Sequence, residues 1–307
     1  MSLIETAKST VNTRLPELVV TPLSGFIGSE IRGVDLRRPL HPEVIDAIRQ
    51  IWLDRKVVFF PDQSLTPEEH IAFAAQFGAP TEGHPVVPGL DGQPKVFEID
   101  YSFAGEAYAH YGDIADRDDW QVSWHTDVTF VKRPPLGSIL RAVTVPPAGG
   151  DTWFSNQVAA FEGLSPALRS FLETLDAVHD GEDQFRPVLD AVGAGTWEGE
   201  VFDTLEPSVH PVVRVIPETG EKALFVNPGF TKRIVGLRKA ESDALLRFLF
   251  EHSVRPEYTV RYHWTEGAIG FWDNRATQHA VTNDFAGQPR KIQRVTLRGD
   301  APVGVQA

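Results

Sequence analysis

Two stretches near the N-terminus carry apolar residues at helical spacing. Residues 41–52 (H-P-E-V-I-D-A-I-R-Q-I-W) place their apolar side chains on one stripe, which predicts a helix. A second helix is predicted over 65–78, where Thr66 can cap the first turn and Pro67 can occupy the first helical position. Glu69 completes a capping box with Thr66, so the start of this helix is well specified.

The rest of the chain is dominated by short β-type segments separated by Gly and Pro turns. The predicted strands are 56–61, 138–145, 210–216, 222–227, 258–264, 268–273, 277–282 and 291–297. The turn P-E-T-G between the third and fourth of these predicts a hairpin, and one more helix is predicted over 241–252. Many strands with a few flanking helices predict a mainly β fold, either a β-sandwich or a jelly-roll barrel.

Composition limits the classes of protein. Hydrophobic residues make up 42% of the 307 residues, enough for a large core, and the absence of Cys excludes disulfides and thiolate metal sites. We expect no membrane span, because no run of about 18 uncharged apolar residues occurs. With no basic start followed by an apolar run, we expect a cytoplasmic protein. A net charge of −13 argues against nucleic-acid binding, so any bound anion must be met by locally placed arginines.

The segment V-S-W-H-T-D-V-T-F (122–130) carries the first candidate chemistry. Its β-branched and aromatic residues predict a strand, on which His125 and Asp127 would point to the same face. A buried carboxylate needs a partner. The triplet alone is weak evidence in a chain with ten His, because a strand-end His can simply bond to a nearby carboxylate.

His279 strengthens the functional interpretation. It interrupts the apolar pattern of W-D-N-R-A-T-Q-H-A-V-T (272–282), so the chain offers two histidines and one carboxylate with no thiolate. Such a set binds one face of an octahedral Fe(II) and leaves three positions open for a chelating cosubstrate and O₂. A three-ligand zinc hydrolase is the chemical alternative.

Two arginines follow shortly after His279 in R-K-I-Q-R-V-T-L (290–297). Arg290 and Arg294 are four residues apart on a predicted strand and would therefore face the same way. Guanidinium groups bind carboxylates and sulfonates through two parallel hydrogen bonds, so an interior anion could be held here. Surface arginines paired with some of the 42 acidic residues are the alternative.

Several longer motifs resemble the taurine dioxygenase family of Fe(II)/2-oxoglutarate-dependent oxygenases. They are W-H-T-D-V-T-F, G-G-D-T-W, L-F-V-N-P-G-F-T-K-R-I-V, W-D-N-R-A-T-Q-H and R-V-T-L-R-G-D. The resemblance extends from about Leu18 to Val303. It implies a single domain over 18–303 with a double-stranded β-helix (jelly-roll) core, after a mobile arm at 1–17. We expect 81–122 to contain a lid.

The resemblance also implies the cofactors. His125, Asp127 and His279 match the Fe(II) ligands and would be the catalytic set. The cosubstrates would be 2-oxoglutarate, with its 5-carboxylate on Arg290 and Thr152, and O₂.

The implied substrate site contains two positions that depart from members of the family that use taurine. In those members the equivalents of Arg294 and His84 hold the sulfonate. The full implied set is His84, Gln121, Val128, Phe185, Phe230 and Arg294. A family Tyr is Val87 here and a family Asn is Gln121, and both of those groups meet the amino end of taurine. This makes a different alkylsulfonate, or an alkyl sulfate ester, a candidate substrate.

The expected reaction is hydroxylation of the carbon next to a sulfonate or sulfate group of a small molecule. It would release an aldehyde with sulfite or sulfate, together with succinate and CO₂. Two alternatives stay open: a related oxygenase acting on a carboxylate substrate such as an aryloxyacetate, and a jelly-roll anion-binding protein without catalysis. The sequence also leaves room for a homo-oligomer.

Overall fold

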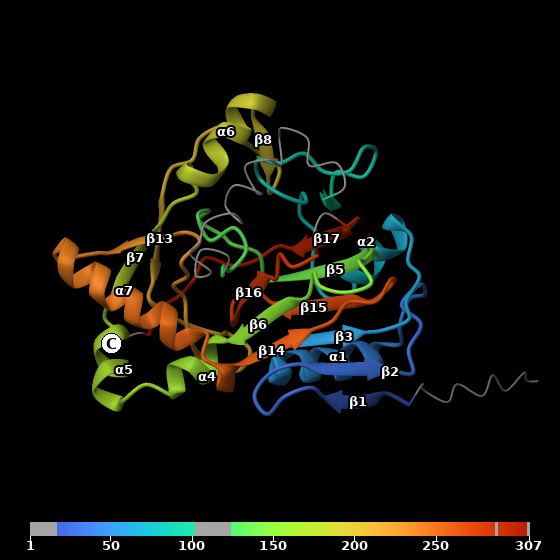
Figure 1. Ribbon diagram of the computed structural model, residues 1–307, viewed down its shortest axis with the longest axis horizontal. Coiled ribbons are helices and arrows are strands. Elements are labelled where there is room, and N and C mark those ends of the chain that lie inside the picture. Colours follow the sequence, from blue (N-terminus) through green and yellow to red (C-terminus); the bar gives the residue numbers. More distant parts are fainter. Residues whose placement is uncertain (1–16, 102–123, 286–287, 306–307) are drawn as a thin grey trace, which may run out of the picture.

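Two β-sheets packed face to face form the centre of the computed structural model, which describes residues 17–101, 124–285 and 288–305 (Figure 1). The larger sheet has the order β1(Val19–Pro22), β2(Ser29–Arg32), β3(Val57–Phe60), β15(Ile269–Asp273), β5(Gly137–Thr144), β17(Lys291–Leu297) and β4(Phe97–Asp100). The smaller sheet has the order β14(Thr259–Tyr262), β6(Thr152–Asn156) and β16(Thr277–Val281). All but one of the strand pairs in these two sheets are antiparallel, the exception being β2 with β3.

Aromatic side chains fill the space between the two sheets. Phe59 of β3 stacks on Tyr262 of β14 with ring centroids 3.6 Å apart, and Phe154 of β6 lies 5.5 Å from Trp272 of β15. These contacts belong to one buried cluster that draws on both sheets. The predicted mainly β fold with a jelly-roll core is therefore confirmed.

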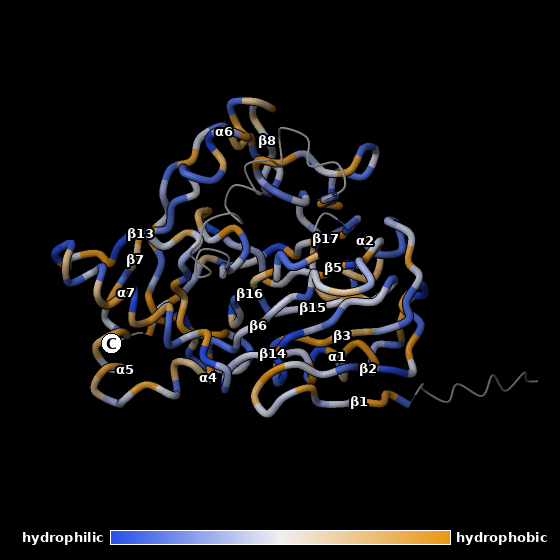
Figure 2. The backbone as a smooth tube through the Cα atoms, viewed as in Figure 1, coloured by the Kyte–Doolittle hydropathy of each residue, from blue (hydrophilic) through white to orange (hydrophobic). Residues whose placement is uncertain are grey.

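Helices cover the outer face of the larger sheet. On β3, Val57 and Phe59 point into the space between the sheets, whereas Val58 and Phe60 pack outward against α1(Pro42–Arg55) and α2(Pro67–Ala75). This alternation is the two-residue period of a strand that is buried on both faces. Figure 2 shows hydrophobic residues recurring where α1 meets β3. The capping box predicted for α2 is present.

The remaining elements form a side layer and a cover. The side layer contains β7(Asp176–His179), β10(Ser208–Pro211), β13(Thr231–Ile234), the predicted hairpin β11(Val213–Val215)–β12(Lys222–Leu224), α4(Gln157–Glu162), α5(Pro166–Leu172), α7(Lys239–Ser253) and the 3₁₀ turn η3(Pro256–Tyr258). The cover contains α6(Glu182–Val192) and the hairpin β8(Gly195–Trp197)–β9(Glu200–Phe202). Figure 1 shows α6 and β8 at the top of the view, above β16 and β17.

The structure corrects two expectations. Residues 124–130 are not a strand: His125 makes one isolated β-bridge and 127–130 form a turn. Arg290 precedes β17 instead of lying on it. That 81–122 contains a lid stays a prediction; its described part, 81–101, leads into β4, which pairs with β17 at the edge of the larger sheet.

Residues 102–122 of the expected lid, which include Gln121, lie outside the described residues, as do positions 1–16 of the expected arm.

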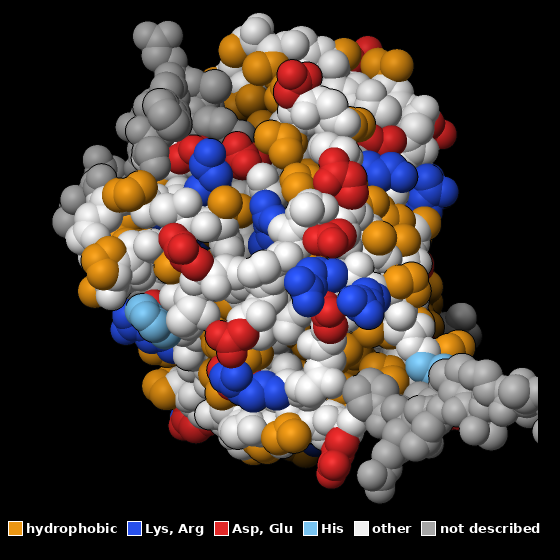
Figure 3. Space-filling model, turned by 90° about the vertical axis from the view of Figure 1, so that its right-hand side faces the viewer, with side chains coloured by type: hydrophobic (Ala, Val, Ile, Leu, Met, Phe, Trp, Pro, Cys, Tyr) orange, Lys and Arg blue, Asp and Glu red, His pale blue; other side chains and the backbone are white. Residues whose placement is uncertain are grey.

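The surface carries both signs of charge. On the face in Figure 3, Lys and Arg side chains alternate with Asp and Glu, and no continuous basic patch occurs there. No helix within the described part of the chain is long and apolar enough to cross a bilayer.

Three buried histidines should make the fold sensitive to acid. Burial lowers the pKa of His70 to about 3 and that of His210 to about 4, and it holds the pKa of His179 well below the usual 6.5. The unfolded chain therefore binds more protons than the folded chain below pH 6.5. We predict that, between pH 6 and 4, the free energy of unfolding falls as the pH is lowered, by at most about 1.4 kcal/mol per pH unit for each histidine.

Urea denaturation at a series of pH values measures this slope. His70 donates from Nε2 to the carbonyl of Ile139 at 3.0 Å, so His70→Gln keeps a donor while removing the titration. That variant should show a slope smaller by the contribution of one histidine. An unchanged slope would contradict the assignment.

Candidate metal and cosubstrate site

The backbone brings two distant histidines together. His125 and His279 form an antiparallel bridge, with His125 N donating to His279 O at 3.0 Å and His279 N donating to His125 O at 2.8 Å. The hydroxyl of Thr126 adds a bond to the carbonyl of Thr277 at 2.8 Å. Because His279 lies on β16, these bonds attach the segment containing His125 to the smaller sheet.

Asp127 follows at the start of a turn and is buried. Its Oδ2 accepts from the hydroxyl of Ser138 at 2.8 Å, and its Oδ1 is ion-paired with Arg294. The next residue, Val128, has φ of 55°, a left-handed conformation that is strained for a β-branched residue. The turn, and not the period of a strand, is what directs Asp127 toward the two imidazoles.

The three side chains converge on one point. Nε2 of His125 lies 3.8 Å and Nε2 of His279 lies 3.9 Å from Oδ1 of Asp127. Burial lowers the pKa of His279 to about 3, and repulsion from His125 adds to this effect, so the imidazole is neutral. Burial alone would raise the pKa of Asp127, but Arg294 and the two histidines hold it below its usual value.

Two imidazoles and one carboxylate are a suitable donor set for a divalent metal. One nitrogen or oxygen from each residue lies within 4.8 Å of the others. The set contains no thiolate, and a His₂-carboxylate set is typical of non-haem Fe(II) sites with open positions. A cation here would also offset the cost of burying the Asp127 carboxylate.

Arg290 is a buried cation with an unsatisfied end. Its Nε donates to the carbonyl of Gly150 at 3.1 Å, while its two terminal nitrogens have no hydrogen-bond partner within the described part of the chain. The guanidinium lies 5.2 Å from the ring of Tyr101 and 6.0 Å from that of Phe285. A buried guanidinium with two free nitrogens is suited to a carboxylate.

Thr152 follows the Gly149–Gly150 turn, whose Gly150 carbonyl accepts the hydrogen bond from Arg290. Gly149 and Gly150 have φ of 81° and 69°, and Thr152 begins β6 two residues later. The hydroxyl of Thr152 accepts from the indole nitrogen of Trp264 at 2.9 Å, which leaves its own hydrogen available to donate. The Arg290 fork and this hydroxyl are suited to the distal carboxylate of a dicarboxylic cosubstrate.

Arg294 and His84 both lie close to the ring of Phe97. The Arg294 guanidinium lies 5.1 Å from the ring centre, and the His84 ring centre lies 5.4 Å away. Nδ1 of His84 accepts from the backbone N–H groups of Val86 and Val87 at 3.1 and 3.0 Å. Nε2 must therefore carry the hydrogen, because burial lowers the pKa of this histidine to about 3 and keeps the ring neutral.

Aromatic side chains enclose this part of the site. Phe185 of α6 lies 4.7 Å from the His84 ring, and Phe230 lies 6.3 Å from the His125 ring. Both belong, with Val128, to the buried cluster beneath the cover. The structure thus joins the three candidate metal ligands to Arg294 and places His84, Val128, Phe185 and Phe230 around them, while Gln121 lies outside the described residues.

Two contributors were missed by the sequence reasoning. Ser138 and Asn274 both bond to Asp127, Ser138 through the carboxylate and Asn274 through the backbone. Asn274 was visible as part of the W-D-N-R motif, but nothing in that motif indicates which backbone groups its amide meets.

Comparison with known proteins identifies the family. The profile described as "Taurine catabolism dioxygenase TauD, TfdA family" matches residues 20–296. The chain belongs to this family. It is therefore a 2-oxoglutarate-dependent dioxygenase, an enzyme class that uses Fe(II), 2-oxoglutarate and O₂, and the donor set at His125, Asp127 and His279 fits such an iron.

Several relatives align with this chain over nearly its whole length. An α-ketoglutarate-dependent sulfate ester dioxygenase from Pseudomonas putida is 40% identical and covers 94% of this chain and 92% of its own. An alkylsulfatase from Acinetobacter baylyi is 39% identical, covering 94% and 87%. The crystal structure of a taurine dioxygenase from Burkholderia xenovorans is 43% identical, with a TM-score of 0.79 and coverage of 94% and 92%.

We predict that Gly150→Ala weakens 2-oxoglutarate binding to the dioxygenase about tenfold, by analogy with other outer contacts of a site. A Cβ at this position would lie 3.0 Å from Cδ of Arg290, so the arginine must move. Calorimetric titration of 2-oxoglutarate into the Mn(II)-loaded protein measures the effect.

Gly220→Ala is the matched control for this substitution. Gly220 also has a positive φ, 71°, but a Cβ there would meet nothing within 4 Å. Both variants should lose about 1 kcal/mol of stability, and only Gly150→Ala should lose affinity. Equal affinities would show that the Gly150 turn does not position Arg290.

Proposed function

We propose that this dioxygenase acts on alkyl sulfate esters and hydroxylates the carbon that bears the sulfate oxygen. The observation that carries the proposal is the pairing of Arg294 with a neutral His84 beside the candidate metal ligands. These two side chains offer a cation and a fixed N–H donor, and a sulfate group offers only acceptor oxygens.

In this proposal, His125, Asp127 and His279 hold Fe(II), which together with 2-oxoglutarate and O₂ supplies the oxidant for an unactivated C–H bond. Arg290 and Thr152 bind the distal carboxylate of 2-oxoglutarate. Support comes from the two terminal nitrogens of Arg290, which lack partners among the described residues. The protein contributes orientation, because both anionic molecules are fixed at their charged ends.

Arg294 and His84 bind the sulfate in this proposal, and Phe185, Phe230 and Val128 exclude water around it. Nε of Arg294 has no hydrogen-bond partner among the described residues, so the guanidinium can donate to sulfate while it stays near Asp127. The His84 tautomer supports the same assignment, because its Nε2–H can donate but cannot accept. A positively charged ligand group would find no acceptor on either residue.

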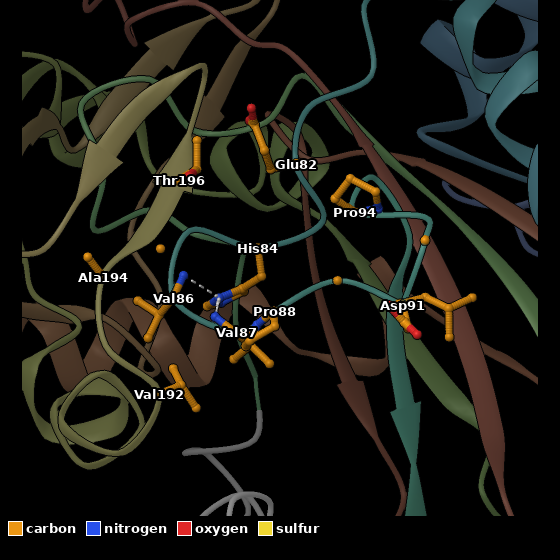
Figure 4. A pocket seen from close by; sticks show the side chains of 14 residues that line it. Glu82, His84, Val86, Val87, Pro88, Asp91, Pro94, Val192, Ala194 and Thr196 are labelled. Atoms are coloured by element: carbon orange, nitrogen blue, oxygen red, sulfur yellow. Dashed lines mark hydrogen bonds between the residues drawn. The ribbon is translucent and has the colours of Figure 1, made fainter.

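We assign the alkyl chain to the cavity next to His84. The cavity has a volume of about 380 Å³, and its inner lining includes Val86 and Val87 (Figure 4). Val192, the last residue of α6, and Ala194, which lies between α6 and β8, also line it. Asp91 lies at the exposed rim. Glu82 and Thr196 also line the cavity, and the buried wall formed by Val86 and Val87 suits a hydrocarbon chain.

The products follow from the position of the hydroxylation. One oxygen atom of O₂ enters succinate, which forms with CO₂, and the other replaces hydrogen on the carbon bonded to the sulfate oxygen. Loss of the new hydroxyl proton forms a C=O bond, and the C–O bond to sulfate breaks with its electron pair. The products are an aldehyde and sulfate. An alkylsulfonate would give an aldehyde and sulfite by the equivalent step.

A substrate panel tests the proposal. We predict that hexyl sulfate, tested against hexanesulfonate, taurine and an aryloxyacetate, gives the highest kcat/KM, with sulfate and succinate formed in equal amounts. The reason is that it fits both the anion-binding pair and the apolar cavity. Strong turnover of taurine, or preferential turnover of the aryloxyacetate, would overturn the substrate assignment. Substrate binding without succinate would favour a binding protein.

Val87→Tyr gives a sharper test of the cavity. The larger side chain should lower kcat/KM for hexyl sulfate at least tenfold while changing ethyl sulfate little, because the short ester does not reach the filled space. Val209→Tyr is the control, since Val209 lies on β10 with 58% of its surface exposed. Equal losses on both esters would show that the alkyl chain lies elsewhere.

A further inference from the structure

One asparagine holds the backbone on both sides of a candidate metal ligand. The side chain of Asn274 accepts from the backbone N–H of Asp127 at 2.9 Å and donates to the backbone carbonyl of Asp127 at 3.0 Å. It also donates to the carbonyl of Pro135 at 3.2 Å. Asn274 is 1% exposed, so these bonds do not compete with bulk water.

The bonds act where the backbone is strained. The carbonyl of Asp127 belongs to the peptide that leads into Val128, whose φ is 55°. The left-handed conformation is unfavourable for a non-glycine residue and persists only where surrounding contacts fix it. Without the hydrogen bonds from Asn274, the backbone of Val128 would lower its energy by moving to a negative φ. The orientation of the Asp127 carboxylate would change with this movement.

Asn274 is itself held in a rigid turn between β15 and β16. Its backbone N–H donates to the carbonyl of Leu136 at 3.1 Å. Its neighbours Asp273 and Arg275 form a buried two-bond ion pair at 2.9 and 2.8 Å, and Arg275 also bonds to Glu218 at 2.7 Å. The same turn leads into β16 and His279, so one short segment connects the carboxylate to the second histidine.

We propose that Asn274 is a positioning residue of the metal centre, which orients Asp127 by holding its peptide groups against the relaxation of Val128. This inference rests on the proposed role of Asp127 as a metal ligand. Asn274 should raise the affinity for the metal. A carboxylate that is already oriented binds a metal more tightly than one that must first be reoriented.

The test is the dissociation constant for Mn(II), measured anaerobically by calorimetry on the full chain. Asn274→Ala should weaken Mn(II) binding by about 10- to 100-fold, the usual effect of removing an outer contact of a metal ligand. Asn274→Asp keeps the acceptor for the Asp127 N–H but loses both donated bonds, and it should also bind Mn(II) more weakly than the wild type. If Asn274→Ala does not fold, the Mn(II) dissociation constant of Asn274→Asp serves as the test instead.

Asn156→Ala is the matched control for lost stability. Asn156 is also buried, and it makes three hydrogen bonds, accepting from Val158 and Ala159 and donating to Phe26. This substitution should lower the melting temperature without changing the Mn(II) dissociation constant. If Asn156→Ala and Asn274→Ala weaken Mn(II) binding equally, the effect is general destabilisation and the proposal is wrong.

A double-mutant cycle with Val128→Gly isolates the mechanism. Glycine adopts a positive φ without strain, so Asn274→Ala should weaken Mn(II) binding less in the Val128→Gly background than in the wild type. Equal losses in both backgrounds would overturn the strain mechanism. Failure of the wild type to bind Mn(II) would instead remove the metal assignment of Asp127, whereas unchanged affinity in Asn274→Ala would refute the role of Asn274 alone.

Discussion

The site depends on a single pair of backbone hydrogen bonds, those between His125 and His279. These residues are far apart in the sequence, and the isolated bridge between them holds their backbones side by side. One partner of the bridge belongs to β16, which pairs with β6 in the smaller sheet. The position of the candidate metal site is therefore set by the same hydrogen bonding that builds the barrel, and not by loops alone.

The second constraint is the electrostatic balance within a barrel that excludes water. Asp127, Arg290 and Arg294 are all buried, in a chain whose net charge is −13. Buried charges are tolerated when they are paired or when they meet a ligand of opposite charge. Asp127 is paired with Arg294 and faces two imidazoles, whereas the free end of Arg290 suits an anion. The cation site at Asp127 is therefore distinct from the two candidate anion sites, one at Arg290 and one at Arg294.

The sequence predicts the barrel well because its signals are local. The alternation of Val57, Val58, Phe59 and Phe60 has the period of a strand buried on both faces, and the capping box at Thr66 and Glu69 is formed by neighbours in the chain. The strand predicted around His125 was wrong because β-branched and aromatic residues also suit a buried turn. In that turn, tertiary bonds outweigh propensity. His179 and His210 contribute such bonds to Thr129.

Other features of the site could not be predicted from residue types. The tautomer of His84 is set by two backbone N–H groups whose directions depend on the loop, and the role of Asn274 depends on which peptide lies opposite its amide. Val128 gives no sequence signal of a positive φ, because β-branched residues rarely adopt one. The candidate ligands could be listed from the sequence, but the contacts that orient them come only from the fold.

We propose that His125, Asp127 and His279 form one iron site that also accepts 2-oxoglutarate. Anaerobic titration of the wild-type protein with Fe(II), followed by 2-oxoglutarate, measures it most directly. We expect a single Fe(II) per chain, binding of 2-oxoglutarate that requires the metal, and loss of both in His279→Ala. Undiminished Fe(II) binding by His279→Ala, or no binding by the wild type, would contradict the account.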